Sequence, residues 1–192
     1  QVIRIPKVLE LIDSQRSVDY LFNLLNHADH EVNEQSLLAL SALKSRYKYL
    51  KFSDKKVKSR IHLEALVFHD SLSLFFDKQL EKSGMPLAET GTAFVLESVP
   101  LVEKDIKRCL GRIFSLLGIL YDPDEMQGVF NAVCGSSTET RLNAIEFLDA
   151  LLDPGIKRLV IPIIEAALSE KLSKDIIRSV DFSKLDLRNL FR

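Results

Sequence analysis

The chain has 192 residues, with 26 Lys and Arg side chains against 27 Asp and Glu, a net charge of −1, two cysteines and no tryptophan. Its hydrophobic content of 46% excludes intrinsic disorder, and no apolar run approaches the ~18 residues that a membrane-spanning helix needs. The composition therefore predicts one soluble domain, and because the chain begins with Gln1 we expect a portion of a longer protein.

The first predicted elements are two helices within residues 1–46. Apolar residues recur every three or four positions over residues 18–25 and again over residues 32–43, which is the spacing of amphipathic helices. Ser17 is a candidate N-cap for the first helix.

Two longer helices are predicted over residues 53–82 and 100–121, the first with Ser53 as a candidate N-cap. At 1.5 Å per residue the first would be a rod of about 40 Å. The segment between them, residues 83–99, holds two glycines and a proline and is expected to be irregular or only partly helical. Two rods joined in this way pair most simply as an antiparallel helical hairpin spanning residues 53–121.

Three shorter helices are predicted in residues 122–170. Asp122-Pro123 and Asp153-Pro154 mark two of their starts, because aspartate caps the free amides and proline in the first turn loses no hydrogen bond. Ser137 is the candidate N-cap of the helix between them. The last helix carries an apolar face at helical spacing, formed by Ile156, Leu159, Val160, Ile163, Ile164, Ala167 and Leu168.

The final segment, residues 171–192, mixes apolar and charged side chains. We expect it to cap the open end of the helical stack, as the ends of solenoids require; a helix that docks on a partner is the alternative. The predicted organisation is thus a single all-helical domain with four parts: residues 1–46, 53–121, 122–170 and 171–192.

An internal repeat links the first and third parts. Residues 18–43 align without a gap on residues 126–151, so that Phe22 falls on Phe130 and Leu40 on Leu148. A helix pair of this kind cannot bury its apolar face alone, which predicts stacking of repeated units. Chance agreement between two amphipathic helix pairs is the alternative explanation.

The clearest family pattern is Val18-x-x-Leu21-Phe22-x-Leu24-Leu25-x-x-x-Asp29-x-x-Val32, continuing to Ser36-Leu37-x-Ala39-Leu40. It resembles the HEAT-repeat family of α-solenoids. The family's arginine is present only in the second unit, as Arg141, where the first unit has Asn33; conversely, Ser137 replaces Asp29. Because the aspartate–arginine ladder is broken, the resemblance implies an all-α fold with a short HEAT-like α-α superhelix, into which the long hairpin is inserted.

A second pattern is Arg112-Ile113-Phe114-Ser115-Leu116-Leu117-x-x-Leu120-Tyr121-Asp122-Pro123, followed by Arg141-x-Asn143-Ala144-x-Glu146-x-Leu148-Asp149-x-Leu151-Leu152-Asp153. It resembles the soluble HEAT-type region of bacterial membrane proteins related to ATP/ADP translocases, in which a nucleotide-transporter-like portion precedes that region. The resemblance implies a cytoplasmic regulatory or scaffolding appendage at the inner face of a membrane, with the transport site outside this chain.

The histidines do not form a metal site by spacing. His27 and His30 fall in the first predicted turn, and no third or fourth ligand follows at zinc spacing. His62 and His69 are seven residues apart, which is not the i, i+4 pair of a metallohydrolase. We expect no metal.

The remaining reactive residues also lack a catalytic pattern. Cys109 and Cys134 have no metal-like spacing and are expected to be reduced, buried thiols. The turn 134–137 has neither the lysine of a P-loop nor a G-x-S-x-G sequence. The sequence therefore predicts neither an enzyme nor a cofactor.

The unusual feature is segregated charge between residues 44 and 60, where one acid, Asp54, accompanies eight basic residues: Lys44, Arg46, Lys48, Lys51, Lys55, Lys56, Lys58 and Arg60. Tyr47, Tyr49 and Phe52 are interleaved. Such a patch suits phosphate groups of nucleic acid, nucleotides or anionic lipids. The alternative is a solvated connector whose aromatic side chains pack against the core.

Together these observations predict a non-catalytic protein-interaction or regulatory domain, resembling the cytoplasmic appendage of a nucleotide (ATP/ADP) transporter-like membrane protein. Its expected partners are another protein or a neighbouring domain of the same chain, and an anionic membrane surface. The alternative is a stand-alone HEAT-like scaffold that binds nucleic acid or another polyanion through residues 44–60.

Overall fold

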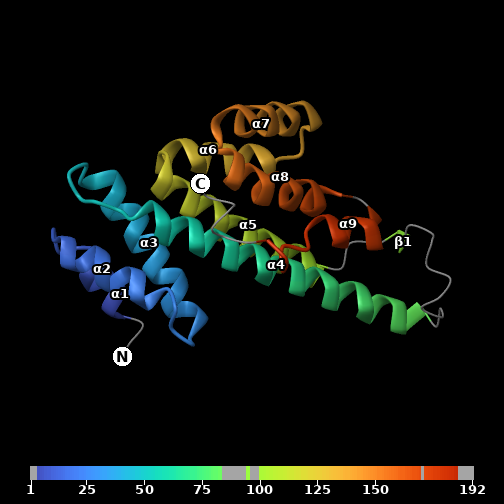
Figure 1. Cartoon of the computed structure of the whole chain (residues 1–192), viewed down its shortest axis with the longest axis horizontal. Coiled ribbons are helices and arrows are strands. Elements are labelled where there is room, and N and C mark those ends of the chain that lie inside the picture. Colours follow the sequence, from blue (N-terminus) through green and yellow to red (C-terminus); the bar gives the residue numbers. More distant parts are fainter. Residues whose placement is uncertain (1–3, 84–93, 96–99, 170, 186–192) are drawn as a thin grey trace. The chain divides into compact units, whose positions relative to one another are not determined.

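The described part of the chain folds mainly into helices (Figure 1). The structure, a computed structural model, describes residues 4–83, 94–95, 100–169 and 171–185, and the side chains of residues 4–78, 105–169 and 173–185. Its described helices are α1 (Ile5–Leu9), α2 (Gln15–Leu24), α3 (His30–Arg46), α4 (Asp54–Ser83), α5 (Pro100–Leu120), α6 (Pro123–Val133), α7 (Thr138–Leu151), α8 (Pro154–Leu168) and α9 (Lys174–Ser179). The predicted all-α class is confirmed.

Only one pair of strands interrupts the helices of the described residues. β1 (Phe94–Val95) pairs antiparallel with β2 (Lys171–Leu172), with Phe94 opposite Leu172 and Val95 opposite Lys171. Of the segment 83–99, predicted to be irregular, the structure describes Ser83, at the end of α4, and β1; the rest lies outside the described residues. The predicted C-terminal cap is described as far as residue 185, apart from residue 170 before it.

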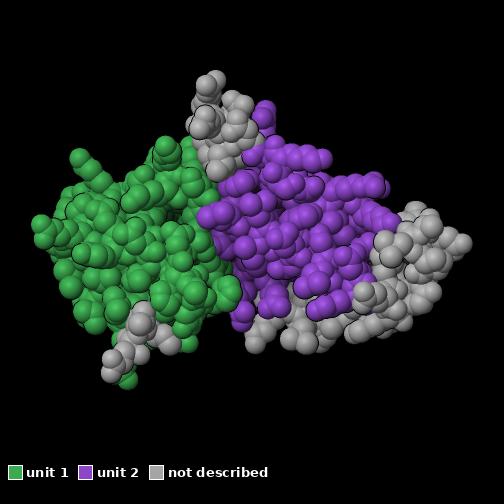
Figure 2. Space-filling model, turned by 60° about the horizontal axis from the view of Figure 1, so that its bottom comes forward, with its two compact units in different colours: residues 1–60, 111–132 green, residues 61–110, 133–192 purple. Residues whose placement is uncertain are grey.

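The contacts divide the chain into two compact units (Figure 2). Unit 1 comprises Gln1–Arg60 and Gly111–Ala132, and unit 2 comprises Ile61–Leu110 and Val133–Arg192. The two long helices contribute to both units: α4 begins in unit 1, and α5 ends there.

Unit 1 is built around α1, α2 and α3, which pack on one another. Fully buried side chains lie at helical spacing along α2 and α3, among them Val18, Leu21 and Leu40. Burial of one such side chain stabilises the fold by about 1.5–3 kcal/mol. The same unit buries Val57 at the start of α4 and Leu117 near the end of α5.

In unit 2, α7 packs on α8 and α8 on α9. The first five positions of the predicted apolar face of α8, from Ile156 to Ile164, are fully buried. Beyond α9, Val180 is fully buried and Phe182 is 3% exposed, so the chain continues to cover the unit after its last helix. Both residues belong to the segment expected to act as a cap.

The helix starts follow the predicted caps with two corrections. Asp153 precedes α8 as predicted, but its side chain makes no capping hydrogen bond. The Ser53 hydroxyl accepts from the Lys56 N–H, and Ser137 accepts from the Thr140 N–H. The prediction of Ser17 as an N-cap is wrong: Ser17 is buried inside α2, and Ser14 caps that helix by accepting from the Arg16 N–H. Ser17 stands directly before the apolar run that begins at Val18, and Ser14 stands four residues before it, so local sequence alone does not separate them.

The two halves of the internal repeat begin their second helices in the same way. Asp29 accepts from the Glu31 N–H at the start of α3, and Ser137, its counterpart in the alignment, caps α7. Val18 and its counterpart Met126 are both fully buried. Substitution of aspartate by serine therefore preserves the capping interaction.

A second pair of counterparts differs. The Arg141 Nε donates to the Gly135 carbonyl at 2.7 Å, which ties the start of α7 to the preceding turn. Asn33 is 6% exposed, and its Oδ1 accepts no hydrogen bond from the described residues. The two halves of the internal repeat therefore share caps and apolar positions but not this polar contact.

Candidate functional site

The eight predicted basic residues all lie in unit 1, around the connection between α3 and α4. Lys44 and Arg46 are in the last turn of α3, and Lys48 and Lys51 are in the connection. The other four, Lys55, Lys56, Lys58 and Arg60, occupy the first two turns of α4. We call residues 44–60 the basic segment.

The basic segment is tethered to residues 10–15, which comprise the connection between α1 and α2 and the first residue of α2. Three contacts join residues that are 36 positions apart: Arg46 with Glu10, Tyr49 with Asp13, and Lys51 with Gln15. The Gln15 amide accepts from the Lys51 N–H at 2.9 Å and donates to the Lys51 carbonyl at 2.8 Å. It therefore supplies both hydrogen bonds that a neighbouring strand would give.

Aromatic rings fix two of the cations. The Lys44 ammonium lies 5.4 Å from the centre of the Phe52 ring, and the Lys56 ammonium lies 5.6 Å from that of Phe22. The two rings meet edge to face with centres 6.4 Å apart. This arrangement holds both ammonium groups by cation–π attraction while Lys56 stays exposed.

The aromatic side chains of the basic segment are not all in the core. Phe52 and Tyr47 are half-buried, whereas Tyr49 is 65% exposed. The Tyr49 hydroxyl donates to the Asp13 carboxylate, and this hydrogen bond, with smaller contributions from desolvation and from the Asp13 and Tyr47 charges, raises the pKa of Tyr49 to about 12.

One acid from a distant part of the sequence lies close to the basic segment. The Lys48 ammonium lies 3.9 Å from the Asp122 carboxylate, which precedes α6. Asp122 also caps that helix by accepting from the N–H groups of Asp124 and Glu125. The Glu125 N–H is the main cause that lowers the pKa of Asp122, and the Lys48 and Lys44 charges add to it.

Several cations keep their charge available. The Arg46–Glu10 pair at 3.6 Å and the Lys48–Asp122 pair neutralise two of the eight. Lys51 and Lys55 are exposed, and within the described part of the chain their ammonium groups have no ion-pair or hydrogen-bond partner. Arg60 is half-buried, and its Nη1 donates to the Asn26 Oδ1 at 3.4 Å.

The distribution of charge at the start of α4 opposes helix stability. The N-terminus of a helix carries about +0.5 of an elementary charge, which favours acids and disfavours cations. Asp54 is the one acid in the first turn of α4, and four basic residues follow within two turns. A bound anion would relieve this repulsion.

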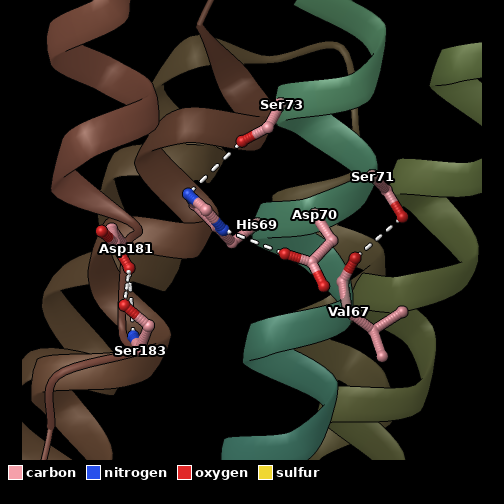
Figure 3. Close-up of polar contacts among 7 residues, drawn as sticks. All are labelled: Val67, His69, Asp70, Ser71, Ser73, Asp181 and Ser183. Carbon is pink, nitrogen blue, oxygen red and sulfur yellow. Dashed lines mark hydrogen bonds and ion pairs between the residues drawn. The ribbon is translucent and has the colours of Figure 1, made fainter.

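A separate polar cluster lies on α4 in unit 2 (Figure 3). The His69 Nδ1 is 3.3 Å from the Asp70 Oδ1, and the Ser73 Oγ is 3.3 Å from the His69 Nε2. With Nδ1 protonated, His69 donates to Asp70 and accepts from Ser73. Neither Asp70 nor Ser73 stands in a catalytic motif, so this group was not predicted; its one signal in the sequence is the four-residue spacing of His69 and Ser73 on a helix.

The order Asp70–His69–Ser73 is that of a nucleophilic triad, but its surroundings differ from those of an active site. The Asp70 side chain is 82% exposed, so water screens its charge from His69. Backbone N–H groups inside a helix are already paired, and those of α4 near Ser73 therefore supply no oxyanion donors. Close by, Asp181 accepts from the Ser183 hydroxyl at 2.6 Å and its N–H at 3.1 Å.

The other candidate residues are dispersed. His27 and His30 are exposed, and the His27 Nδ1 accepts from the Asp29 N–H at 3.0 Å. His62 is buried beside the Phe182 carbonyl. In the described residues no three His, Cys, Asp or Glu side chains come together as a metal site.

The two cysteines, Cys109 and Cys134, form no disulfide among the described residues and are half-buried, so they are less enclosed than the sequence predicts. Desolvation raises the pKa of the Cys134 thiol, against the opposing charges of Lys107 and Arg141. A thiol with a raised pKa carries less of the reactive thiolate.

Comparison with known proteins found no match: no family model, no curated protein and no solved structure corresponds to the chain. Among the helices of the described residues, none combines the length and apolarity needed to cross a bilayer.

Proposed function

We propose that the chain is a non-catalytic binding domain that attaches to an anionic membrane surface through the basic segment, as the cytoplasmic appendage of a nucleotide (ATP/ADP) transporter-like membrane protein. Lipid phosphates are the ligands of the cations, and the rest of the parent protein is the second partner. In this proposal, the scaffold of the domain is a HEAT-like superhelix that contains the α4–α5 hairpin.

One observation carries the binding role: basic residues are concentrated where they weaken the helix that holds them. Lys55 and Lys56 stand in the first turn of α4, at the positive end of its dipole. A sequence selected for stability alone would place acids there. Departures of this kind from local consistency are expected at functional sites.

The tethers supply the second argument. Contacts with Glu10, Asp13 and Gln15 hold the connection between α3 and α4 in place. The cations of the connection are therefore positioned before a ligand arrives. Preorganisation lowers the ordering cost of binding. Each basic residue close to an anionic bilayer contributes about 1 kcal/mol.

The repeat supports the scaffold. The sequences of α2 and α3 and of their counterparts α6 and α7 share the cap position of Asp29 and Ser137 and fully buried counterparts such as Leu40 and Leu148. Stacked helix pairs of this type present an extended surface to partners.

Vesicle flotation tests the proposal. The chain should float with vesicles that contain phosphatidylserine and stay in the soluble fraction with pure phosphatidylcholine. Binding should weaken steeply between 50 and 200 mM salt, a range chosen because surface electrostatics are screened there. Equal binding to neutral vesicles would contradict an electrostatic attachment.

A nucleic-acid partner is the second candidate, favoured by the exposed ring of Tyr49 on the same segment as the exposed lysines Lys51 and Lys55. Proteins that bind single strands combine cations with rings on which bases stack. Salt-sensitive binding to mixed-sequence DNA or RNA, in a chain that ignores anionic vesicles, would establish this candidate in place of the membrane.

A further inference from the structure

Unit 1 carries a strip of exposed aliphatic side chains on α1 and the turn after it. Ile5 is 44% exposed, Val8 56%, Leu11 72% and Ile12 46%. The spacing of Ile5, Val8 and Ile12 places them on one side of a helical turn, and the bonds Leu11 N–H to Val8 and Ile12 N–H to Leu9 continue that turn beyond α1. Isolated exposed aliphatic residues are ordinary; four together are not.

This strip adjoins the basic segment. Leu11 and Ile12 lie between Glu10 and Asp13, the two acids that contact Arg46 and Tyr49. The same tethers that position the basic segment therefore bring its cations next to the strip.

Further cations belong to the same stretch of chain. Arg4 and Lys7 are exposed on either side of Ile5, and Arg16 is exposed at the start of α2. Of the two acids next to Leu11 and Ile12, Glu10 is ion-paired with Arg46, and Asp13 accepts a hydrogen bond from the Tyr49 hydroxyl. Aliphatic side chains framed by basic residues are the combination that binds the interface of an anionic bilayer.

The chemistry selects a bilayer over other occupants. A nucleic acid offers phosphates to the cations but no aliphatic interior for Leu11 and Ile12. A helix of another protein would match the aliphatic residues, while the free ammonium groups of Lys51 and Lys55 would then need acidic partners. A bilayer with anionic headgroups satisfies both sets at once.

We infer that the turn formed by residues 8–12, here called the apolar turn, inserts Leu11 and Ile12 into the boundary between headgroups and acyl chains, while the basic segment contacts the lipid phosphates. This inference rests on the membrane partner of the proposed function. It adds that attachment requires shallow insertion as well as charge.

A single tryptophan tests the insertion, because the chain has none of its own. Leu11→Trp should show a blue-shifted emission on anionic vesicles and quenching by lipids brominated near the headgroup end of the acyl chains. Leu142→Trp is the control, since Leu142 is 56% exposed on α7 of unit 2. Its emission should change neither in wavelength nor in intensity.

A second pair of variants separates insertion from charge. Leu11→Ser combined with Ile12→Ser should weaken binding to anionic vesicles about tenfold, from the loss of partly inserted aliphatic surface. The melting temperature should stay within about 2 °C, because both side chains are exposed.

The outcomes distinguish the two claims. Anionic binding with an unquenched Leu11→Trp, or with unchanged affinity of the serine variant, overturns the insertion and leaves the electrostatic attachment standing. Absence of any vesicle binding overturns both. A blue shift without lipid, accompanied by dimers in analytical ultracentrifugation, assigns the apolar turn to a second copy of the chain and overturns the insertion.

Discussion

At the scale of single residues, the basic segment is held by contacts that the local sequence does not predict. Tyr49 is the clearest case: its ring is exposed, yet its hydroxyl is committed to Asp13, and this contact raises the pKa of Tyr49 to about 12. Because the folded pKa lies above the ordinary value of about 10, the contribution of this hydrogen bond to folding is fully present below pH 10. It is lost as the pH rises toward 12.

An alkaline titration tests this contact. In the wild-type chain, absorbance at 295 nm should show one tyrosine ionising near pH 12. Asp13→Ala removes the acceptor and the nearby charge, so one tyrosine equivalent should move about two pH units lower. Superimposable titration curves for the two proteins would show that Asp13 does not hold Tyr49 in solution.

Residue contacts also explain what the sequence could not reveal of the site. The eight cations and the interleaved aromatic residues are visible as a run between residues 44 and 60. The partners Glu10 and Asp122 are not, because they lie 36 and 74 positions away from Arg46 and Lys48 and come near only through the packing of the helices. The apolar turn was equally hidden, since exposure of Leu11 depends on what the fold leaves uncovered.

At the scale of elements, helices were predictable because their apolar residues recur at 3.6-residue spacing. The predicted helices over 53–82 and 100–121 correspond to α4 (Asp54–Ser83) and α5 (Pro100–Leu120) within a residue or so at each end. The start of α2 was not predicted, since Ser14 and Ser17 are chemically equal caps. Tertiary packing buries Ser17 and leaves Ser14 to cap the helix.

The start of α4 makes a prediction that separates stability from binding. Lys55→Glu replaces an unfavourable charge at the second position of the helix by a favourable one, which should stabilise the chain by about 1 kcal/mol. The melting temperature should rise by about 2–4 °C. Lys78→Glu makes the same change of charge at an exposed position in the later part of α4, and should give no rise.

A lower melting temperature for Lys55→Glu would contradict this account of the helix. It would mean that Lys55 has a stabilising partner in solution.

The corner between α5 and α6 makes a prediction about close packing. A Cβ on Gly118 would lie 2.9 Å from the Cα of Pro123, whereas a Cβ on Gly128 would meet nothing within 4 Å. Gly118→Ala should therefore destabilise the chain by about 1–3 kcal/mol. Gly128→Ala lies inside α6 and should stabilise it by about 0.5–1 kcal/mol.

Urea unfolding of the two alanine variants measures both effects. The same corner places Asp122 beside Lys48, so Gly118→Ala should also disturb that ion pair. Equal free energies of unfolding for the two variants would contradict the close approach of the corner.

At the scale of the whole molecule, a net charge of −1 conceals a strong local asymmetry. The basic segment holds eight of the 26 basic residues and one of the 27 acids. Unit 1 adds to it an exposed apolar turn, while unit 2 carries its polar cluster around His69. The all-α class followed from composition and periodicity; division into two units did not, because it depends on contacts between segments far apart in sequence.

The central claim is that the free cations of the basic segment are present for an anionic surface and not for the fold. Binding of the Lys51→Glu/Lys55→Glu variant to vesicles containing phosphatidylserine tests it most directly. Two control substitutions, Lys78→Glu and Lys184→Glu, make the same change in net charge at exposed positions of unit 2. We expect the variant to lose binding by at least tenfold while it stays at least as stable as the wild type, and the control to bind normally. Equal binding by the variant and the wild type, or equal losses in variant and control, would contradict the claim.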